Sequence, residues 1–159
     1  MNEIAARVYV LNSSDAPALK KILEYDPYLD QNLLPKLPKK WEDADDKYFA
    51  AHPEEKAEAD KLKKQLGDAA EKLKNDKDAN IIFARQDYQL RDGISMGLDR
   101  EKSYLYLSAD DAFLDSGETK LKKSVSSLQR AQKDVEKKVI STIEEERQKS
   151  DSGLGLIFG

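Results

Sequence analysis

The chain has 159 residues, of which 27 are basic and 31 acidic, so that 36% are charged. This length fits a single domain over residues 1–159, and the balance of signs indicates solvated helix surfaces rather than an acidic disordered tail. The absence of cysteine excludes disulfides, thiolate nucleophiles and cysteine-ligated metals. No segment approaches the roughly 18 apolar residues of a membrane span, and no secretory leader opens the chain. We therefore expect a cytoplasmic protein.

The first elements are predicted from residue type and from polar boundaries. Residues 4–11 predict a strand because β-branched and aromatic residues dominate them. The polar cluster at residues 12–15 can cap a helix, and the apolar spacing predicts that helix over residues 16–25. Pro27 ends it, since the residue before a proline is pushed away from the α region.

Residues 26–78 predict a helical insertion or connector within the domain. Three of the five prolines lie in residues 26–40, which indicates irregular backbone there. Pro53 then suits the first position of a helix. A helix over residues 54–75 follows from apolar residues three and four positions apart: Ala59, Leu62, Leu66, Ala69 and Leu73.

Residues 80–108 predict a β-rich block. Its first strand covers residues 81–91 and is followed by Asp92 and Gly93, a pair typical of a tight type I′ hairpin. The alternation of apolar residues predicts a second strand over 94–98 and a third over 103–108.

Residues 118–148 predict one long amphipathic helix. Its apolar face consists of Leu121, Val125, Leu128, Val135, Val139 and Ile143. At about 1.5 Å per residue such a helix is about 45 Å long, more than a small sheet needs as cover. We therefore expect a homodimer, in which Gln132 within the apolar face could fix the register. The apolar residues Leu154–Phe158 suit a final strand.

This order of elements predicts an α+β fold. The expected architecture is an antiparallel sheet of four to five strands with helices on one face, in ferredoxin-like βαββαβ order with a helical insertion. The alternative is a prefoldin-like helical hairpin with β-hairpins over residues 54–148, which leaves both chain ends unexplained.

The first candidate site is the sheet face that points away from the predicted helices. Strand alternation assigns to it Arg7, Tyr9, Phe83, Arg85, Gln89, Arg91, Tyr104 and Tyr106. Aromatic and arginine side chains on an open sheet can stack on bases or on other planar ligands. Residues 8–12 resemble the first-strand motif of RNA recognition motif domains, although the companion motif is missing. The competing interpretation is that the insertion or a second subunit covers this face.

The second candidate is a basic stripe on the long helix. It consists of Lys123, Arg130, Lys133 and Lys137, opposite the apolar face. This helix would carry basic residues near its start and acidic residues near its end, and that order is unfavourable for the helix dipole. Such a stripe could bind phosphates or an acidic partner, or it could be a solvated surface without a task.

Catalytic and metal-binding signatures are weak by comparison. A carboxylate enzyme would need Asp87 near Asp110 or Asp111 in one pocket, but the acidic residues of that region also suit a helix start. His52, the only histidine, precedes a proline at a predicted helix junction. No nucleotide-binding motif is present, and no cofactor or metal is expected.

The sequence names no ligand and no reaction. Its best-supported function is a non-catalytic binding or assembly module that associates with itself, or with a protein partner, through long helices or the sheet face. The alternatives are a single-stranded RNA-binding domain that uses the aromatic face, and a small carboxylate- or metal-dependent enzyme.

Overall fold

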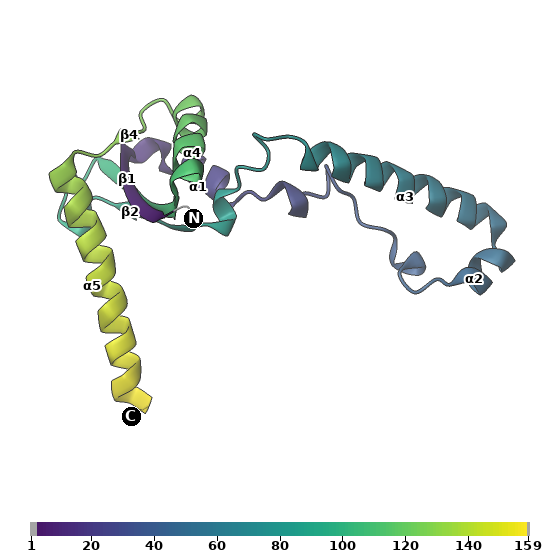
Figure 1. The fold of residues 1–159 in the computed structure, drawn as a ribbon. Helices are drawn as coiled ribbons and strands as arrows, with labels where there is room; N and C mark the ends of the chain where they lie inside the picture. Colours follow the sequence, from purple (N-terminus) through teal and green to yellow (C-terminus); the bar gives the residue numbers. More distant parts are fainter. Residues whose placement is uncertain (1–2, 159) are drawn as a thin grey trace. The chain divides into compact units, whose positions relative to one another are not determined.

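The computed structural model describes the backbone of residues 3–158 and the side chains of residues 3–151. The chain divides into two compact units (Figure 1). Met1–Tyr25 and Phe83–Gly159 form the first, here called the sheet domain, and Asp26–Ile82 form the second, the insertion unit. Over the part of the chain that is described, no helix combines the length and the apolar character needed to cross a membrane.

The sheet domain is built on four strands, all paired antiparallel. These are β1 (Ile4–Asn12), β2 (Asp87–Asp92), β3 (Lys102–Asp110) and β4 (Gln129–Arg130), in the order β2-β3-β1-β4. In the central pair, Val8 lies opposite Tyr106 and Tyr9 lies opposite Leu105. The predicted α+β class with an antiparallel sheet of four strands is therefore confirmed.

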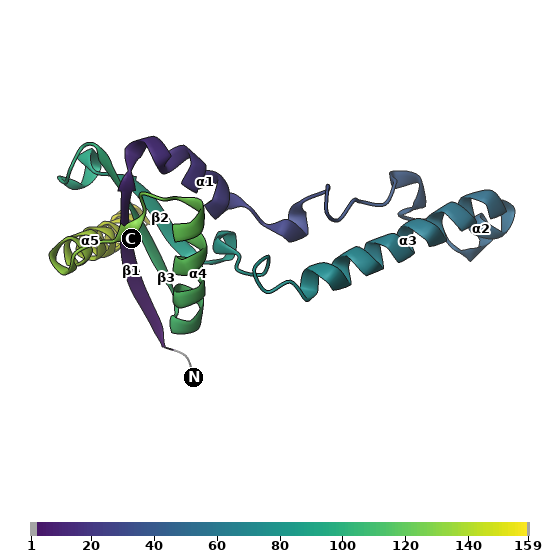
Figure 2. The same ribbon diagram turned by 90° about the horizontal axis from the view of Figure 1, so that it is seen from above.

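Helices cover both faces of this sheet (Figure 2). Helices α1 (Ala16–Glu24) and α4 (Asp111–Ser124) lie on one face, and α5 (Lys133–Phe158) lies on the other. The prediction of helices on one face only is wrong. The central strands are apolar on both sides, since Tyr9 and Leu105 are buried on one face while Val8 and Tyr106 are buried on the other. Each face therefore needs a cover that excludes water.

The single helix predicted over residues 118–148 is also wrong. Helix α4 ends at Ser124, the short strand β4 follows, and α5 begins at Lys133. The buried residues Val125 and Leu128 belong to the connection between the helices and not to a helical face. Gln132 stands just before α5, where its carbonyl accepts a hydrogen bond from the Glu136 amide.

The connection between β2 and β3 is longer than the predicted hairpin, and residues 94–98 form no strand. Gly93 has a φ of −66°, whereas Gly97 adopts the left-handed φ of 67°. A Cβ on Gly93 would lie 1.7 Å from the Asp99 carbonyl oxygen, so this position needs glycine for a close backbone approach. The strand predicted at residues 154–158 is likewise absent, because α5 continues to Phe158.

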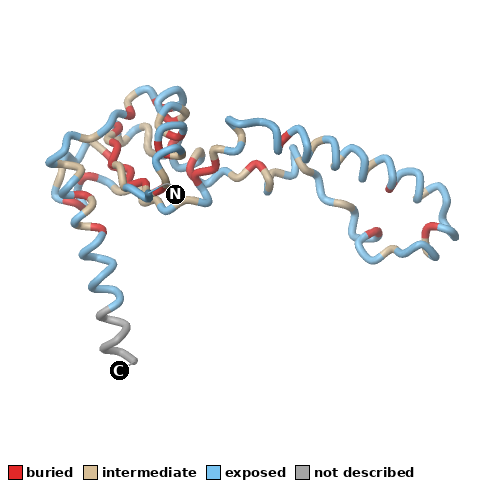
Figure 3. The backbone as a smooth tube through the Cα atoms, viewed as in Figure 1, coloured by how far each residue is buried: buried red, intermediate tan, exposed pale blue. Residues whose placement is uncertain are grey.

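The insertion unit contains α2 (Asp46–Ala51) and α3 (Pro53–Lys74). Its small core consists of Trp41, Phe49 and Ala59, and most of α3 is exposed (Figure 3). The prefoldin-like alternative does not match, because β2 and β3 share one sheet with β1 and residues 118–148 form two helices.

Candidate binding surfaces

The eight residues predicted to share a sheet face are divided by the structure. Gln89, Arg91, Tyr104 and Tyr106 lie on the face that α5 covers, whereas Arg7 and Tyr9 lie on the opposite face. Phe83 and Arg85 belong to a 3₁₀ turn before β2 and to no strand. The prediction fails because Tyr9 lies opposite Leu105 rather than opposite a tyrosine.

Helix α5 closes the face that carries the tyrosines. Tyr104 and Tyr106 are only 5% and 6% exposed, and they pack with Val139 and Ile143 of α5. The cover is therefore part of the sheet domain itself, and neither the insertion unit nor a second subunit is needed for it. In this structure the two aromatic rings offer no surface on which a base could stack.

Two arginine–carboxylate pairs attach α5 to β2. Both terminal guanidinium nitrogens of Arg91 donate to Glu146, at 2.7 and 3.0 Å. Those of Arg147 donate to Asp87, at 2.8 and 3.1 Å. The neighbouring Arg91 lowers the pKa of the Glu146 carboxyl. The Arg147 guanidinium also lies over the Tyr106 ring, 5.5 Å from its centroid, so this part of α5 lies over the Gln89–Tyr106 pair of β2 and β3.

Arg7 and Tyr9 take part in a different cluster, which joins β1 to α4 and β4. Arg7 donates to Asp115 at 2.8 Å, and Glu118 lies within 3.8 Å of both Arg7 and Arg130. The buried Tyr9 hydroxyl lies beside Glu118 but makes no hydrogen bond of normal geometry within residues 3–151. Burial, reinforced by Glu118, raises the pKa of Tyr9 to about 12.

The residues of the predicted basic stripe do not lie on one helix. Lys123 lies in the last turn of α4, Arg130 lies in β4, and Lys133 and Lys137 lie in the first turns of α5. The guanidinium of Arg130 is paired with Glu118 and Glu136. The stripe was expected on a single helix, and the break after Ser124 separates its members.

Two of the three carboxylates that were candidates for a catalytic pair lie in the same pocket. Asp87 and Asp110 line one pocket of about 470 Å³. Asp87 is held by Arg147, however, and Asp110 caps α4 by accepting a hydrogen bond from the Phe113 amide at 2.7 Å. Residues 3–151 contain no group of three potential metal-ligating side chains. His52 is exposed and stacks on the Tyr48 ring.

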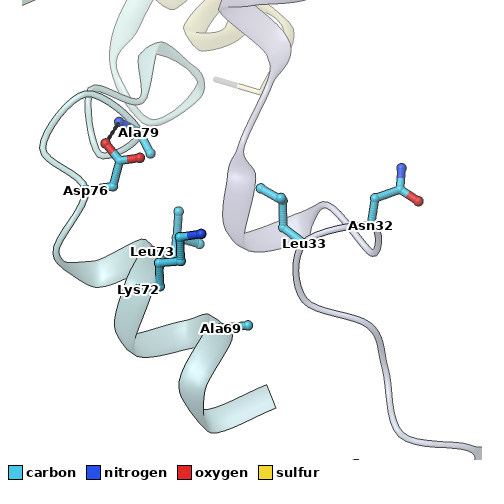
Figure 4. Close-up of a pocket in the computed structure, with 7 residues that line it drawn as sticks. All are labelled: Asn32, Leu33, Ala69, Lys72, Leu73, Asp76 and Ala79. Atoms are coloured by element: carbon cyan, nitrogen blue, oxygen red, sulfur yellow. Dashed lines mark hydrogen bonds between the residues drawn. The ribbon is translucent and has the colours of Figure 1, made fainter. Parts of the chain in front are cut away.

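The insertion unit has an apolar hollow of about 290 Å³ (Figure 4). Leu33 of the connector faces the end of α3, where Ala69 and Leu73 complete the apolar part of the lining. Asp76 closes the turn after α3 by accepting a hydrogen bond from the Ala79 amide at 3.1 Å. Asn32, Lys72 and Asp76 supply the polar part of the lining.

Strand β2 is the outer strand of the sheet, and among the described residues no further strand pairs with it. The Gly93 amide donates to the Lys102 carbonyl, and hydrogen-bonded pairs alternate along an antiparallel ladder. By this alternation Asp87, Gln89 and Arg91 direct their backbone groups to β3. The amide and carbonyl groups of Tyr88 and Leu90 therefore point away from the sheet.

A groove runs beside this edge. It has a volume of about 390 Å³ and is lined by Lys20, Leu23 and Glu24 of α1 together with residues 88–91 of β2. Strand edges that avoid pairing are usually protected by lysine, proline or a bulge. β2 contains neither lysine nor proline, and its register with β3 is continuous over all six positions, although Asp87, Arg91 and Asp92 are charged.

Comparisons with protein-family models, with curated proteins and with solved structures find no match for this chain. The β2 edge and its contacts with α5 were not predicted from the sequence. The charges of Asp87 and Arg91 were visible there, but which strand lies at an edge depends on the order of strands in the sheet.

Proposed function

We propose that this protein is a non-catalytic binding module that joins another polypeptide by adding one strand to the edge of its sheet at β2. The observation that carries the proposal is the outward direction of the backbone groups of Tyr88 and Leu90. Unpaired amides and carbonyls at a sheet edge are the groups that strand addition uses. The neighbouring groove contributes apolar surface from Leu23 of α1.

Two further observations favour the edge over the faces. Both faces of the sheet are covered by helices, and the tyrosines of the face under α5 are buried. The opposite edge is partly closed, because β4 pairs with Tyr9 and Val10, and Glu136 accepts the Val8 amide. The homodimer was expected to form through the apolar face predicted for residues 118–148. Val139 and Ile143 of that face are buried within the chain.

The proposal includes a ferredoxin-like architecture for the sheet domain. Its support is the element order β1-α1-β2-β3-α4-β4, which alternates as βαββαβ. The strand order β2-β3-β1-β4 and the antiparallel pairing of all neighbours agree with it. In this architecture α5 is an addition that covers the second face, and residues 26–82 are inserted between α1 and β2.

Phage-displayed random peptides selected on the full chain test this function. Leu90→Pro removes an outward amide without removing a bond to β3, so we expect selected peptides to bind this variant at least about tenfold more weakly. Ala6→Pro is the matched control. By the same alternation Ala6 directs its amide away from β3 at the other edge, since the Val8 carbonyl accepts the Ala131 amide.

Circular dichroism first establishes that both variants keep their secondary structure. Tyr88→Pro, which removes the other outward amide, should repeat the loss of binding and covers the case in which Leu90→Pro does not fold. Equal binding of the selected peptides to the wild type and to the folded proline variants of β2 would contradict the proposal.

A further inference from the structure

We infer that the strand received by β2 runs antiparallel to it and carries, in order, an acidic, an apolar, a polar, an apolar and a basic residue, and that it comes from a different polypeptide. This inference rests on the proposed function and names the partner by its chemistry. Its basis is the charge order of β2, the groove beside α1 and the position of α5.

The backbone of β2 sets the alternation in the partner. Residues opposite Tyr88 and Leu90 would exchange amide–carbonyl bonds with them, and antiparallel pairing is the slightly more stable arrangement per residue. Their side chains would lie on the same face as Tyr88 and Leu90, beside Leu23. Apolar residues suit these two positions because they lose water there.

The charges on β2 set the two ends of the pattern. Arg91 and Asp87 lie on the other face, on either side of Gln89, and opposite charges directly across a strand pair stabilise it. Arg91 is 22% exposed and Asp87 46%, so both remain open to a neighbour despite their partners on α5. An antiparallel strand therefore places its acidic residue opposite Arg91 and its basic residue opposite Asp87.

A second copy of this chain would satisfy the charge pattern, since β2 itself reads Asp-Tyr-Gln-Leu-Arg over residues 87–91. Symmetric pairing in this register places a two-fold axis beside Gln89. Glu146 and Arg147 hold α5 above that point, and α5 continues past the sheet (Figure 1). Two packed helices need axes about 8–10 Å apart, so a second α5 placed over the same point would compete with the first for this space.

A free peptide with the sequence Asp-Tyr-Gln-Leu-Arg-Asp tests the pattern, because it carries the charges of β2 without α5. Binding to the full chain is measured by fluorescence anisotropy, and the protected amides are located by NMR hydrogen exchange. We expect binding that protects Tyr88 and Leu90. A peptide with its first aspartate and its arginine exchanged should bind about tenfold more weakly, because both cross-strand pairs become like-charged.

Two N-methylated peptides form a matched pair that tests the backbone contact. N-methylation of the tyrosine and the leucine blocks the amides that point to β2 and should abolish binding. N-methylation of the glutamine alters an amide that points away and should leave binding within about twofold. If neither modification matters, or if other amides become protected, strand addition itself is wrong. If the pair differs but charge exchange has no effect, only the charge pattern is wrong.

The identity of the occupant is tested with Gln89→Cys in the full chain, which otherwise has no cysteine. In a symmetric β2 pair the two Cα atoms would lie about 4.5 Å apart, within the range that a disulfide spans. We expect no covalent dimer under mild oxidation. A disulfide-linked dimer that forms in preference to one of the control Arg91→Cys would identify a second copy as the partner and overturn the inference.

Discussion

Individual residues set the boundaries of the helices in the sheet domain. The Asp110 carboxylate accepts the Phe113 amide and starts α4. Lys122 and Lys123 lie in the last turn of α4, and Asp134 and Glu136 lie in the first turn of α5. Basic residues at a helix end and acidic residues at a helix start are both favourable for the dipole. The charge order that is unfavourable for one long helix is therefore the signature of two helices.

Tyr9 gives a prediction at the residue scale. In the unfolded chain its phenol loses its proton near pH 10, whereas burial beside Glu118 raises the pKa in the folded state to about 12. Between these values the unfolded state binds fewer protons, so stability falls as the pH rises. The loss can reach about 3 kcal/mol.

Tyr9→Phe should remove this part of the alkaline loss. It should change the free energy of unfolding by no more than about 1 kcal/mol at neutral pH, because the hydroxyl lacks a hydrogen bond of normal geometry within the described side chains. Urea titrations of both proteins between pH 8 and about 12 measure the difference. Parallel pH curves for the two proteins would show that Tyr9 is not the responsible group.

Residue patterns alone predicted the elements whose signals are local. The strand at residues 4–11, the helices at 16–25 and 54–75 and the strand at 103–108 agree with β1, α1, α3 and β3. The candidate face failed because alternation gives two faces per strand but not which faces combine. Only the register, with Tyr9 opposite Leu105, decides that.

At the scale of elements, the apolar residues of 118–148 show why their helical spacing predicted one helix where the chain forms two. Leu121, Val139 and Ile143 are all fully buried, so each was correctly assigned to a core. They pack on opposite faces of the sheet, however, and helical spacing over a whole segment cannot reveal a change of face between its halves. The outer position of β2 could not be predicted either, because it follows from the strand order of the complete sheet.

Helix α5 gives the prediction at this scale. Val139 and Ile143 are fully buried against the sheet, whereas the ion pairs to β2 are exposed. Apolar contact should therefore dominate the attachment of α5. Ile143→Ala should lower the free energy of unfolding by about 2–4 kcal/mol, because it removes buried methyl groups and leaves a cavity.

The matched control for this variant is Glu145→Ala, a change at an exposed position of the same helix. Its unfolding midpoint in urea should stay close to that of the wild type. If Ile143→Ala has an equally small effect, α5 does not depend on this apolar contact, and its role as the cover of the tyrosine face would have to be abandoned.

At the scale of the whole molecule, the proposed binding edge and the insertion belong to two different compact units. Helix α1, strand β2 and helix α5 all belong to the sheet domain, and residues 26–82 form a compact unit of their own. The buried core of the sheet domain includes Leu19, Phe83 and Leu114, all outside the insertion. The sheet domain therefore has a buried core of its own.

Replacement of residues 26–82 by a short Gly/Ser linker should leave a folded sheet domain that still binds the Asp-Tyr-Gln-Leu-Arg-Asp peptide. The shorter connection costs little, since loop-closure entropy changes slowly with length. Circular dichroism and urea unfolding measure folding, and anisotropy measures affinity, which should remain within about threefold of the full chain because α1, β2 and α5 are unchanged. A folded variant that has lost the peptide would place the binding surface in the insertion unit, where Leu33 and Leu73 line the hollow beside α3.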